Sequence, residues 1–241
     1  MTDRRLLRLT GPEKEDFLQG LVTNDITHAP AYAALLTPQG KYLADFFVIP
    51  DGDGILLDVA AVQADDLKKR LSMYKLRAKV EINDDPRQVT RGTGAAPDGA
   101  IADPRDPALG WRAYGVGSDD DTDWDAIRVA HLVPEAGAEL IPNDSYILEH
   151  DFERLKGVDF RKGCYVGQEV TARMKHKTTL KKGLRRVVLD GEVPSGTPIL
   201  MADGREAGVV HTQSGGRGIA YLRFDRVAEG MTADGVSVRV E

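Results

Sequence analysis

The sequence has almost no cysteine: Cys164 is the only one among 241 residues. A single thiol excludes an intramolecular disulfide. It also excludes a self-contained cysteine-ligated iron–sulfur cluster, which takes about four thiolates, and a multi-cysteine zinc site. The five histidines include no close pair of the i, i+4 kind, so we expect no permanent metal site. If Cys164 ligates a metal, the other ligands must come from a partner.

Long apolar runs and net positive charge are also lacking. No stretch approaches the roughly 18 apolar residues of a spanning helix, and no signal-like apolar run follows Met1–Arg8. The net charge of 32 − 38 = −6 argues against a nucleic-acid coat or an anionic membrane surface as the main partner. We therefore expect a cytoplasmic protein without a membrane partner.

Strand and helix patterns alternate through the first third of the chain. Residues 31–49 predict a β-hairpin, because Thr37-Pro38-Gln39-Gly40 has turn chemistry at its centre. Residues 62–77 predict the clearest helix, with an apolar face. Two opposite-charge i, i+4 pairs are expected to support it: Asp65/Lys69 and Asp66/Arg70.

The later parts of the chain have different patterns. Residues 91–125 lack apolar periodicity and are rich in Gly, Asp and Pro. Within them, the acidic run Asp119–Asp121 with Asp123 and Asp125 predicts a solvated surface loop or the start of a helix. From about residue 183, short β-rich runs separated by turn residues favour a small antiparallel barrel.

Basic residues are concentrated in residues 161–186, which hold nine Lys or Arg and a single acid, Glu169. Most charge runs are solvated faces. The alternative is an anion site, for a polyglutamylated cofactor tail or RNA phosphates. Cys164 lies in this segment between Gly163 and Gly167, and cationic neighbours favour the reactive thiolate. The opposing interpretation is a small buried hydrophobic residue.

The segment Lys162-Gly163-Cys164-Tyr165-Val166-Gly167-Gln168-Glu169, with Arg173 beyond it, resembles the K-G-C-[FY]-x-G-Q-E-x3-R signature of the YgfZ family. That family includes bacterial folate-binding proteins and a related mitochondrial iron–sulfur assembly factor. Shorter likenesses extend over most of the chain, among them Phe17–Ile26 near the start and Ala220–Arg223 near the end.

The resemblance implies a fold. The YgfZ family is similar to the glycine-cleavage T-protein, whose three domains surround a central tetrahydrofolate channel. We therefore expect an α+β, three-domain arrangement with a C-terminal antiparallel β-barrel. The expected domains are residues 1–45 plus 140–180 (a split α+β domain), 46–139 (a ferredoxin-like α+β domain) and 181–241 (the barrel).

The resemblance also implies a site. Its functional thiol is Cys164, and the signature residues expected to act with it are Lys162, Tyr165, Gln168, Glu169 and Arg173. The implied cofactor is tetrahydrofolate or a related reduced folate. The residues expected to contact it are Glu149, Asn24 and Arg173. A carboxylate such as Glu149 can accept two N–H bonds from a pterin side by side.

The function implied by the resemblance is that of a folate-binding accessory protein for iron–sulfur cluster assembly or repair. Its partners would be a reduced folate and cluster-carrying client or scaffold proteins, with an indirect effect on tRNA modification. One alternative is a folate-dependent methyl or aminomethyl transferase, whose activity should survive Cys164→Ala. Another is a factor that contacts tRNA directly, with steep salt dependence.

Overall fold

Five antiparallel strands form the first sheet of the computed structural model, which describes residues 3–177 and 179–241. The sheet has the order β2-β3-β4-β1-β5. Its strands are β1 (Arg4–Thr10), β2 (Ala31–Leu36), β3 (Tyr42–Asp51), β4 (Gly54–Ala60) and β5 (Glu81–Asp85). The predicted hairpin of residues 31–49 is β2 and β3, paired from Ala31↔Val48 to Leu36↔Tyr42.

Both faces of this sheet are covered. Alternate residues of β3 enter different cores: Phe46 packs under α2 (Ala61–Lys75), whereas Phe47 packs against the chain segment that follows α3. Period-two alternation and two apolar layers explain why eight consecutive residues of β3 are buried. The short helix α1 (Lys14–Gln19) and the 3-10 turn η1 (Ile26–His28) complete the α2 side.

The helix predicted at residues 62–77 is present as α2, which begins at Ala61 and ends at Lys75. Only one of its two expected ion pairs forms. Arg70 bonds Asp66, but Asp65 bonds Arg5 of β1 instead of Lys69.

A small sheet lies in the region that lacks apolar periodicity in the sequence. Residues 91–125 contribute to a three-stranded sheet of order β6-β8-β7. Its members are β6 (Val89–Gly92), β7 (Ile101–Ala102) and β8 (Trp111–Tyr114), with the 3-10 turn η2 (Pro107–Leu109) between the last two. The sequence does not reveal these strands, because they are short and are stabilised by buried charges rather than by apolar alternation. The acidic run is a loop that ends at the start of a helix, as predicted, since Asp123 caps the helix over Trp124–His131.

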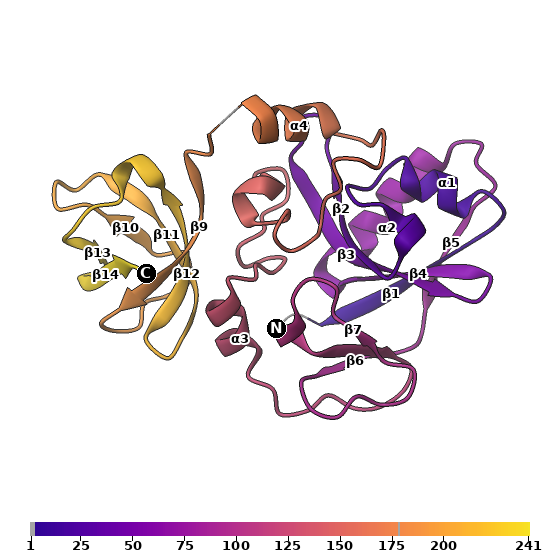
Figure 1. The fold of residues 1–241 in the computed structure, drawn as a ribbon, viewed down its shortest axis with the longest axis horizontal. Coiled ribbons are helices and arrows are strands. Elements are labelled where there is room, and N and C mark those ends of the chain that lie inside the picture. The colour runs from indigo at the N-terminus through magenta and orange to yellow at the C-terminus, as the bar shows by residue number, and fades with distance from the viewer. Residues whose placement is uncertain (1–2, 178) are drawn as a thin grey trace.

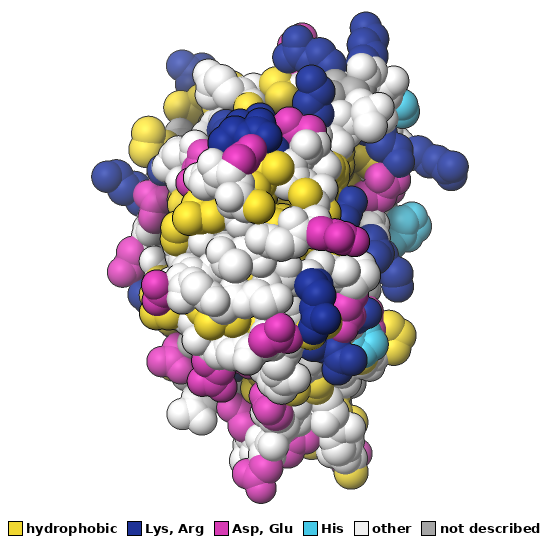
Figure 2. Space-filling model, turned by 90° about the vertical axis from the view of Figure 1, so that its left-hand side faces the viewer, with side chains coloured by type: hydrophobic (Ala, Val, Ile, Leu, Met, Phe, Trp, Pro, Cys, Tyr) yellow, Lys and Arg dark blue, Asp and Glu magenta, His cyan; other side chains and the backbone are white. Residues whose placement is uncertain are grey.

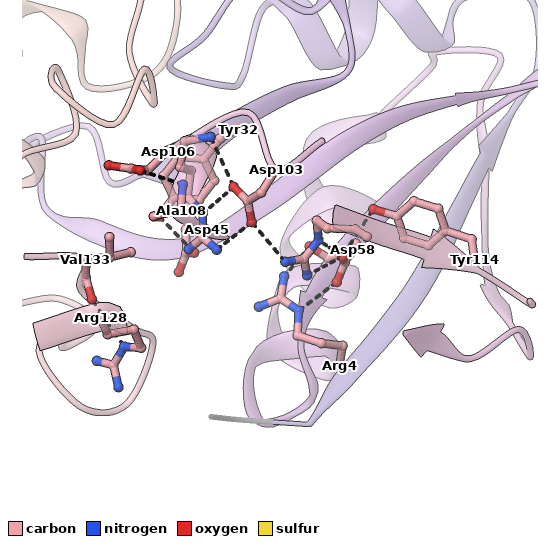
Figure 3. Close-up of polar contacts among 12 residues, drawn as sticks. Arg4, Tyr32, Asp45, Asp58, Asp103, Asp106, Ala108, Tyr114, Arg128 and Val133 are labelled. Carbon is pink, nitrogen blue, oxygen red and sulfur yellow. Dashed lines mark hydrogen bonds and ion pairs between the residues drawn. The ribbon is translucent and has the colours of Figure 1, made fainter. Parts of the chain in front are cut away.

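Those buried charges join the small sheet to the first one. Asp58 of β4 accepts hydrogen bonds from Arg4 of β1 (Nε–Oδ1, 2.6 Å) and Arg112 of β8 (Nη2–Oδ2, 2.6 Å), as Figure 3 shows for Arg4. Burial raises the pKa of Asp58, but the two guanidinium groups outweigh it and hold the pKa below its ordinary value. Asp103 extends the network from Arg112 to Arg105.

The expected domain division between residues 45 and 46 falls inside β3. The hydrogen-bonded register of β2 and β3 continues through this point, and β4 and β5 belong to the same sheet as β1. The first sheet therefore extends across both of the expected α+β domains.

The C-terminal part is a closed barrel of order β10-β11-β12-β9-β14-β13, which confirms the expected antiparallel barrel. Figure 1 shows it at one end of the molecule, with α1 and α2 at the other. Its elements are β9 (Lys182–Leu189), β10 (Pro198–Leu200), β11 (Glu206–Ser214), β12 (Arg217–Arg223), η4 (Phe224–Arg226), β13 (Met231–Ala233) and β14 (Val236–Val240).

The barrel is attached to the rest of the chain by α3 (Trp124–His131) and the segment after it. Val129 of α3 packs against Leu184 and Ile219 of the barrel. Buried Glu139 accepts a hydrogen bond from the Thr212 hydroxyl (2.6 Å) and pairs with Arg128. The 3-10 turn η3 (Ile147–His150) and the helix α4 (Gln168–Lys177) follow, and α4 leads towards β9 along the top of Figure 1.

Candidate functional site

The loop before α4 is anchored by Lys162. Its ammonium donates to the carbonyl oxygens of Gln19 and Val22, both at 2.5 Å, and so attaches the loop to the end of α1. Burial lowers the pKa of Lys162 to about 8, while the carboxylates of Asp25 and Asp159 act in the opposite direction. Lys162 therefore holds the Cys164 loop against the end of α1 in this structure.

Two consecutive residues fix the loop to both cores. Tyr165 is buried in the core that contains Phe152, whereas Val166 packs against the core under α2. The Tyr165 amide donates to Gln168 Oε1 (3.1 Å), which ties the loop to the first turn of α4. Thus Tyr165 and Gln168 hold the loop in place.

Gly167 allows a close backbone approach. Its φ of +84° is in the left-handed region, and a Cβ there would lie 2.5 Å from the Thr37 carbonyl oxygen. Gly163 also has a positive φ, +95°, but a Cβ there would meet nothing within 4 Å. The two glycines of the signature therefore have different uses: a close contact at Gly167 and backbone conformation alone at Gly163.

Cys164 itself is exposed. The interpretation of Cys164 as a small buried hydrophobic residue is therefore wrong. Its neighbours on either side are held by hydrogen bonds or by packing, so an accessible thiol is carried on a well-supported loop.

The charged residues of α4 are mainly on the surface. Glu169 and Arg173 are exposed, and Lys175 pairs with Glu153 (Nζ–Oε1, 2.5 Å). Figure 2 shows Lys and Arg side chains gathered at the top of the molecule, where Figure 1 places α4. The basic segment thus forms a solvated face next to the thiol loop.

Glu149 lies in a separate pocket between η3 and the barrel. The pocket encloses about 270 Å³. Its lining residues are Lys41, Glu139, Ile141, Asp144, Ser145, Tyr146, Glu149, His150, Lys182, Val209, His211 and Tyr221. Polar side chains dominate this lining, with carboxylates, two imidazoles and two phenols.

The Glu149 carboxylate is already engaged by the barrel. Tyr221 of β12 donates its hydroxyl proton to Glu149 Oε2 at 2.6 Å, and its ring stacks on His150 with centroids 5.3 Å apart. Burial and the bond to Glu149 raise the pKa of Tyr221 well above its ordinary value. Burial lowers the pKa of His150 and of His211, which favours their neutral forms.

Asn24, the other expected folate contact, lies elsewhere. Its side-chain amide donates to the carbonyl oxygens of Tyr32 (2.8 Å) and Lys156 (2.7 Å). It lines a hollow of about 440 Å³ with Phe160, Arg161 and other residues, and not the Glu149 pocket. The structure therefore does not bring Glu149 and Asn24 into one pocket.

Sequence reasoning missed the partners of Glu149. In the sequence, Tyr221 is only part of a resemblance, and no pattern assigns His150, His211 or Lys182 to a pocket. The hydrogen bond from Tyr221 to Glu149 spans 72 positions. No local pattern could have indicated it.

Two kinds of feature are absent from residues 3–177 and 179–241. No group of three or more His, Cys, Asp or Glu in that part of the chain is arranged to hold a metal ion. No helix there is long and apolar enough to cross a membrane.

The fold is shared with a solved enzyme. The crystal structure of glycine cleavage system aminomethyltransferase T from Bartonella henselae matches 99% of this chain and 82% of that chain, with a TM-score of 0.76 and 13% identity. At this identity the likeness shows the fold alone, and it confirms the expected T-protein-like α+β architecture. Residues 181–241 match the family model described as the CAF17 C-terminal beta-barrel domain.

Sequence relatives are closer. The mitochondrial iron–sulfur cluster assembly factor IBA57 homolog of Neurospora crassa is 33% identical, over 85% of this chain and 56% of the relative. The mitochondrial IBA57 of Mus musculus is 30% identical, over 93% of this chain and 76% of the relative. The chain belongs to the IBA57 family of iron–sulfur cluster assembly factors. This IBA57-family protein spans only a little over half the length of the fungal relative.

The relatives refine one expectation and overturn another. The signature resembles that of the YgfZ family, but the relatives carry the IBA57 name, so the chain is grouped with the assembly factors rather than with the bacterial folate-binding proteins. The expectation of a cytoplasmic protein was wrong for this IBA57-family chain, because these relatives are named as mitochondrial.

Proposed function

We propose that the chain binds a reduced folate and supports the assembly or repair of iron–sulfur clusters in client enzymes. The observation that carries the cluster role is the placement of Cys164. It is the only thiol in the sequence, it is exposed, and the loop around it is anchored through Lys162 and Tyr165. An anchored thiol open to solvent suits a contact with a second protein.

The cluster is cargo that Cys164 ligates together with a partner. One thiolate leaves about three ligand positions, which a scaffold or client protein supplies. Thiolate-ligated clusters are anionic, and the exposed guanidinium groups of Arg161 and Arg173 favour negative charge near the loop. An effect on tRNA modification would then be indirect, through clients that carry clusters.

The folate site of this proposal is the Glu149 pocket. Its volume of about 270 Å³ suits a bicyclic head group better than a complete cofactor with its tail. Glu149 would accept N–H bonds from the pterin, and Lys182 and Lys41 at the same pocket would favour an anionic tail. Bound folate brings a one-carbon carrier next to the barrel. In this arrangement, Arg173 contributes charge, and Asn24 supports the backbone at Tyr32 and Lys156 instead of contacting the ligand.

The cluster role is tested with Cys164→Ala in cells that lack the endogenous factor. We expect the variant to accumulate normally, because the side chain is exposed, but to leave iron–sulfur enzymes inactive. Glu153→Gln, a change at a nearby exposed acid, serves as the control for expression and should rescue. Full rescue by Cys164→Ala would sink the cluster proposal and favour a one-carbon transferase.

The folate role is tested by titration calorimetry with tetrahydrofolate. Glu149→Gln keeps the shape of the side chain but removes its charge, so we expect binding to weaken about tenfold or more. Glu153→Gln is the matched carboxylate control and should bind as the wild type does. Equal affinity of all three proteins would refute a folate contact at Glu149 and leave the Cys164 proposal standing.

A further inference from the structure

An exposed apolar turn lies at the end of α2. Leu76 follows the helix and is 88% exposed, and Met73 in the last turn is 67% exposed. Side chains this exposed protrude from the surface. Figure 1 shows the connection from α2 to β5 at the end of the molecule opposite the barrel.

The backbone of this turn is strained. Leu76 has φ 45° and ψ −102°, and the amide of Ala78 donates to the carbonyl of Lys75 at 2.7 Å. These features describe a type II′ turn with Leu76 at a position that glycine normally occupies. A large apolar residue that is both strained and exposed contributes little to folding, so its presence needs another reason.

Cations surround this apolar tip. Residues 67–80 hold six Lys or Arg and no acid, in a chain of net charge −6. Two of the six are paired, Lys68 with Asp84 and Arg70 with Asp66. The other four form no ion pair within residues 3–177 and 179–241: Lys69, Lys75, Arg77 and Lys79. Lys69 is in this group because its expected partner Asp65 bonds Arg5 instead.

We propose that this α2 knuckle (Met73, Leu76, Lys69, Lys75, Arg77 and Lys79) binds the surface of an anionic lipid bilayer. The apolar tip would enter the boundary between head groups and acyl chains, while the cations meet lipid phosphates. The net negative charge of the chain opposes binding to an anionic membrane. At the α2 knuckle, however, the local charge is positive. Binding is peripheral and involves no spanning helix.

A bilayer fits the knuckle better than a protein surface does. A stable protein interface buries about 800 Å² on each partner, whereas the knuckle is one helix end and its turn, with two strongly exposed apolar side chains. A bilayer deforms around such a tip without a complementary groove. This orientation leaves the barrel directed away from the lipid.

The test is sedimentation of the full chain with vesicles of phosphatidylcholine, with and without phosphatidylglycerol. We expect the wild type to bind only the anionic vesicles, and less at about 300 mM salt than at about 50 mM salt. Leu76→Gly removes the apolar tip and relieves the strained turn. It should melt at a higher temperature than the wild type and yet bind about tenfold less tightly.

Matched variants separate the contributions of charge and apolar contact. Arg77→Glu with Lys79→Glu should abolish binding to anionic vesicles, whereas Arg77→Lys with Lys79→Arg, and separately Leu76→Met, should retain it. The proposal is overturned if the wild type does not bind anionic vesicles at low salt, as a purely proteinaceous partner would predict. It is also overturned if Leu76→Gly and the charge-reversal variant bind as tightly as the wild type.

Discussion

The Cys164 loop and the Glu149 pocket are supported in opposite ways. Around Cys164, the neighbours are buried or hydrogen-bonded and the thiol is left in solvent. At Glu149, the carboxylate itself is bonded, to Tyr221 of the barrel. The thiol is therefore free for contact with solvent or another molecule, whereas the Glu149 carboxylate already accepts a hydrogen bond from a phenol. A short sequence signature can therefore encode the Cys164 loop. The Glu149–Tyr221 contact forms only when the barrel packs against the 3-10 turn that carries Glu149.

The largest expected effect on stability concerns the base of the Cys164 loop. Gly167→Ala should lower the free energy of unfolding by about 3 kcal/mol, since it combines a disfavoured positive φ with a Cβ clash against Thr37. Gly163→Ala has the positive φ without the clash, and should lower it by about 1 kcal/mol. Urea unfolding of both variants measures the difference. Equal losses would show that the close packing at Gly167 does not support the loop.

The next effect concerns the anchor of the same loop. Lys162→Met keeps the aliphatic stem but removes the bonds to Gln19 and Val22, so we expect a loss of about 2 kcal/mol. The loosened loop should also reduce rescue of iron–sulfur enzymes in cells, although Cys164 is still present. Lys181→Met, a change at an exposed residue, is the control and should be neutral. A neutral Lys162→Met would mean that the loop needs no anchor.

The contrast between the Cys164 loop and the Glu149 pocket also shows which parts of the structure the sequence can predict. The hairpin, α2 and the barrel were predictable because their apolar periodicity and turn residues are local. The small sheet was not, since its attachment depends on buried pairs such as Arg112 with Asp58, 54 positions apart. Likewise, the signature located Cys164, but its exposure depends on Tyr165 and Val166 entering two different cores. The partner of Glu149 comes from the barrel, which sequence spacing cannot place.

A smaller effect should appear in the pH dependence of the anchor. The pKa of Lys162 is about 8 in the folded chain, below the value of about 10.4 expected after unfolding. Between these values the unfolded state binds more protons, so the contribution of Lys162 to stability grows as the pH rises. Since the side chain is only half-buried, we expect the wild type to gain about 1 kcal/mol over Lys162→Met from pH 7 to about pH 10. A difference that falls with pH would contradict the lowered pKa.

The smallest effect tests the pocket side of the comparison. Tyr221→Phe removes the hydroxyl bonded to Glu149 but keeps the ring that stacks on His150, so stability should fall by no more than about 1 kcal/mol. If the phenol competes with a pterin for Glu149, the same change should tighten tetrahydrofolate binding a few-fold in calorimetry, even though the fold is weakened. Tyr146→Phe, also at the pocket, is the control for loss of a hydroxyl and should leave the affinity unchanged. Weaker binding by Tyr221→Phe would instead show that the hydroxyl contributes to the folate site. The Glu149 pocket would then be ready to bind its ligand without rearrangement, as the Cys164 loop is, and the contrast between the two sites would disappear.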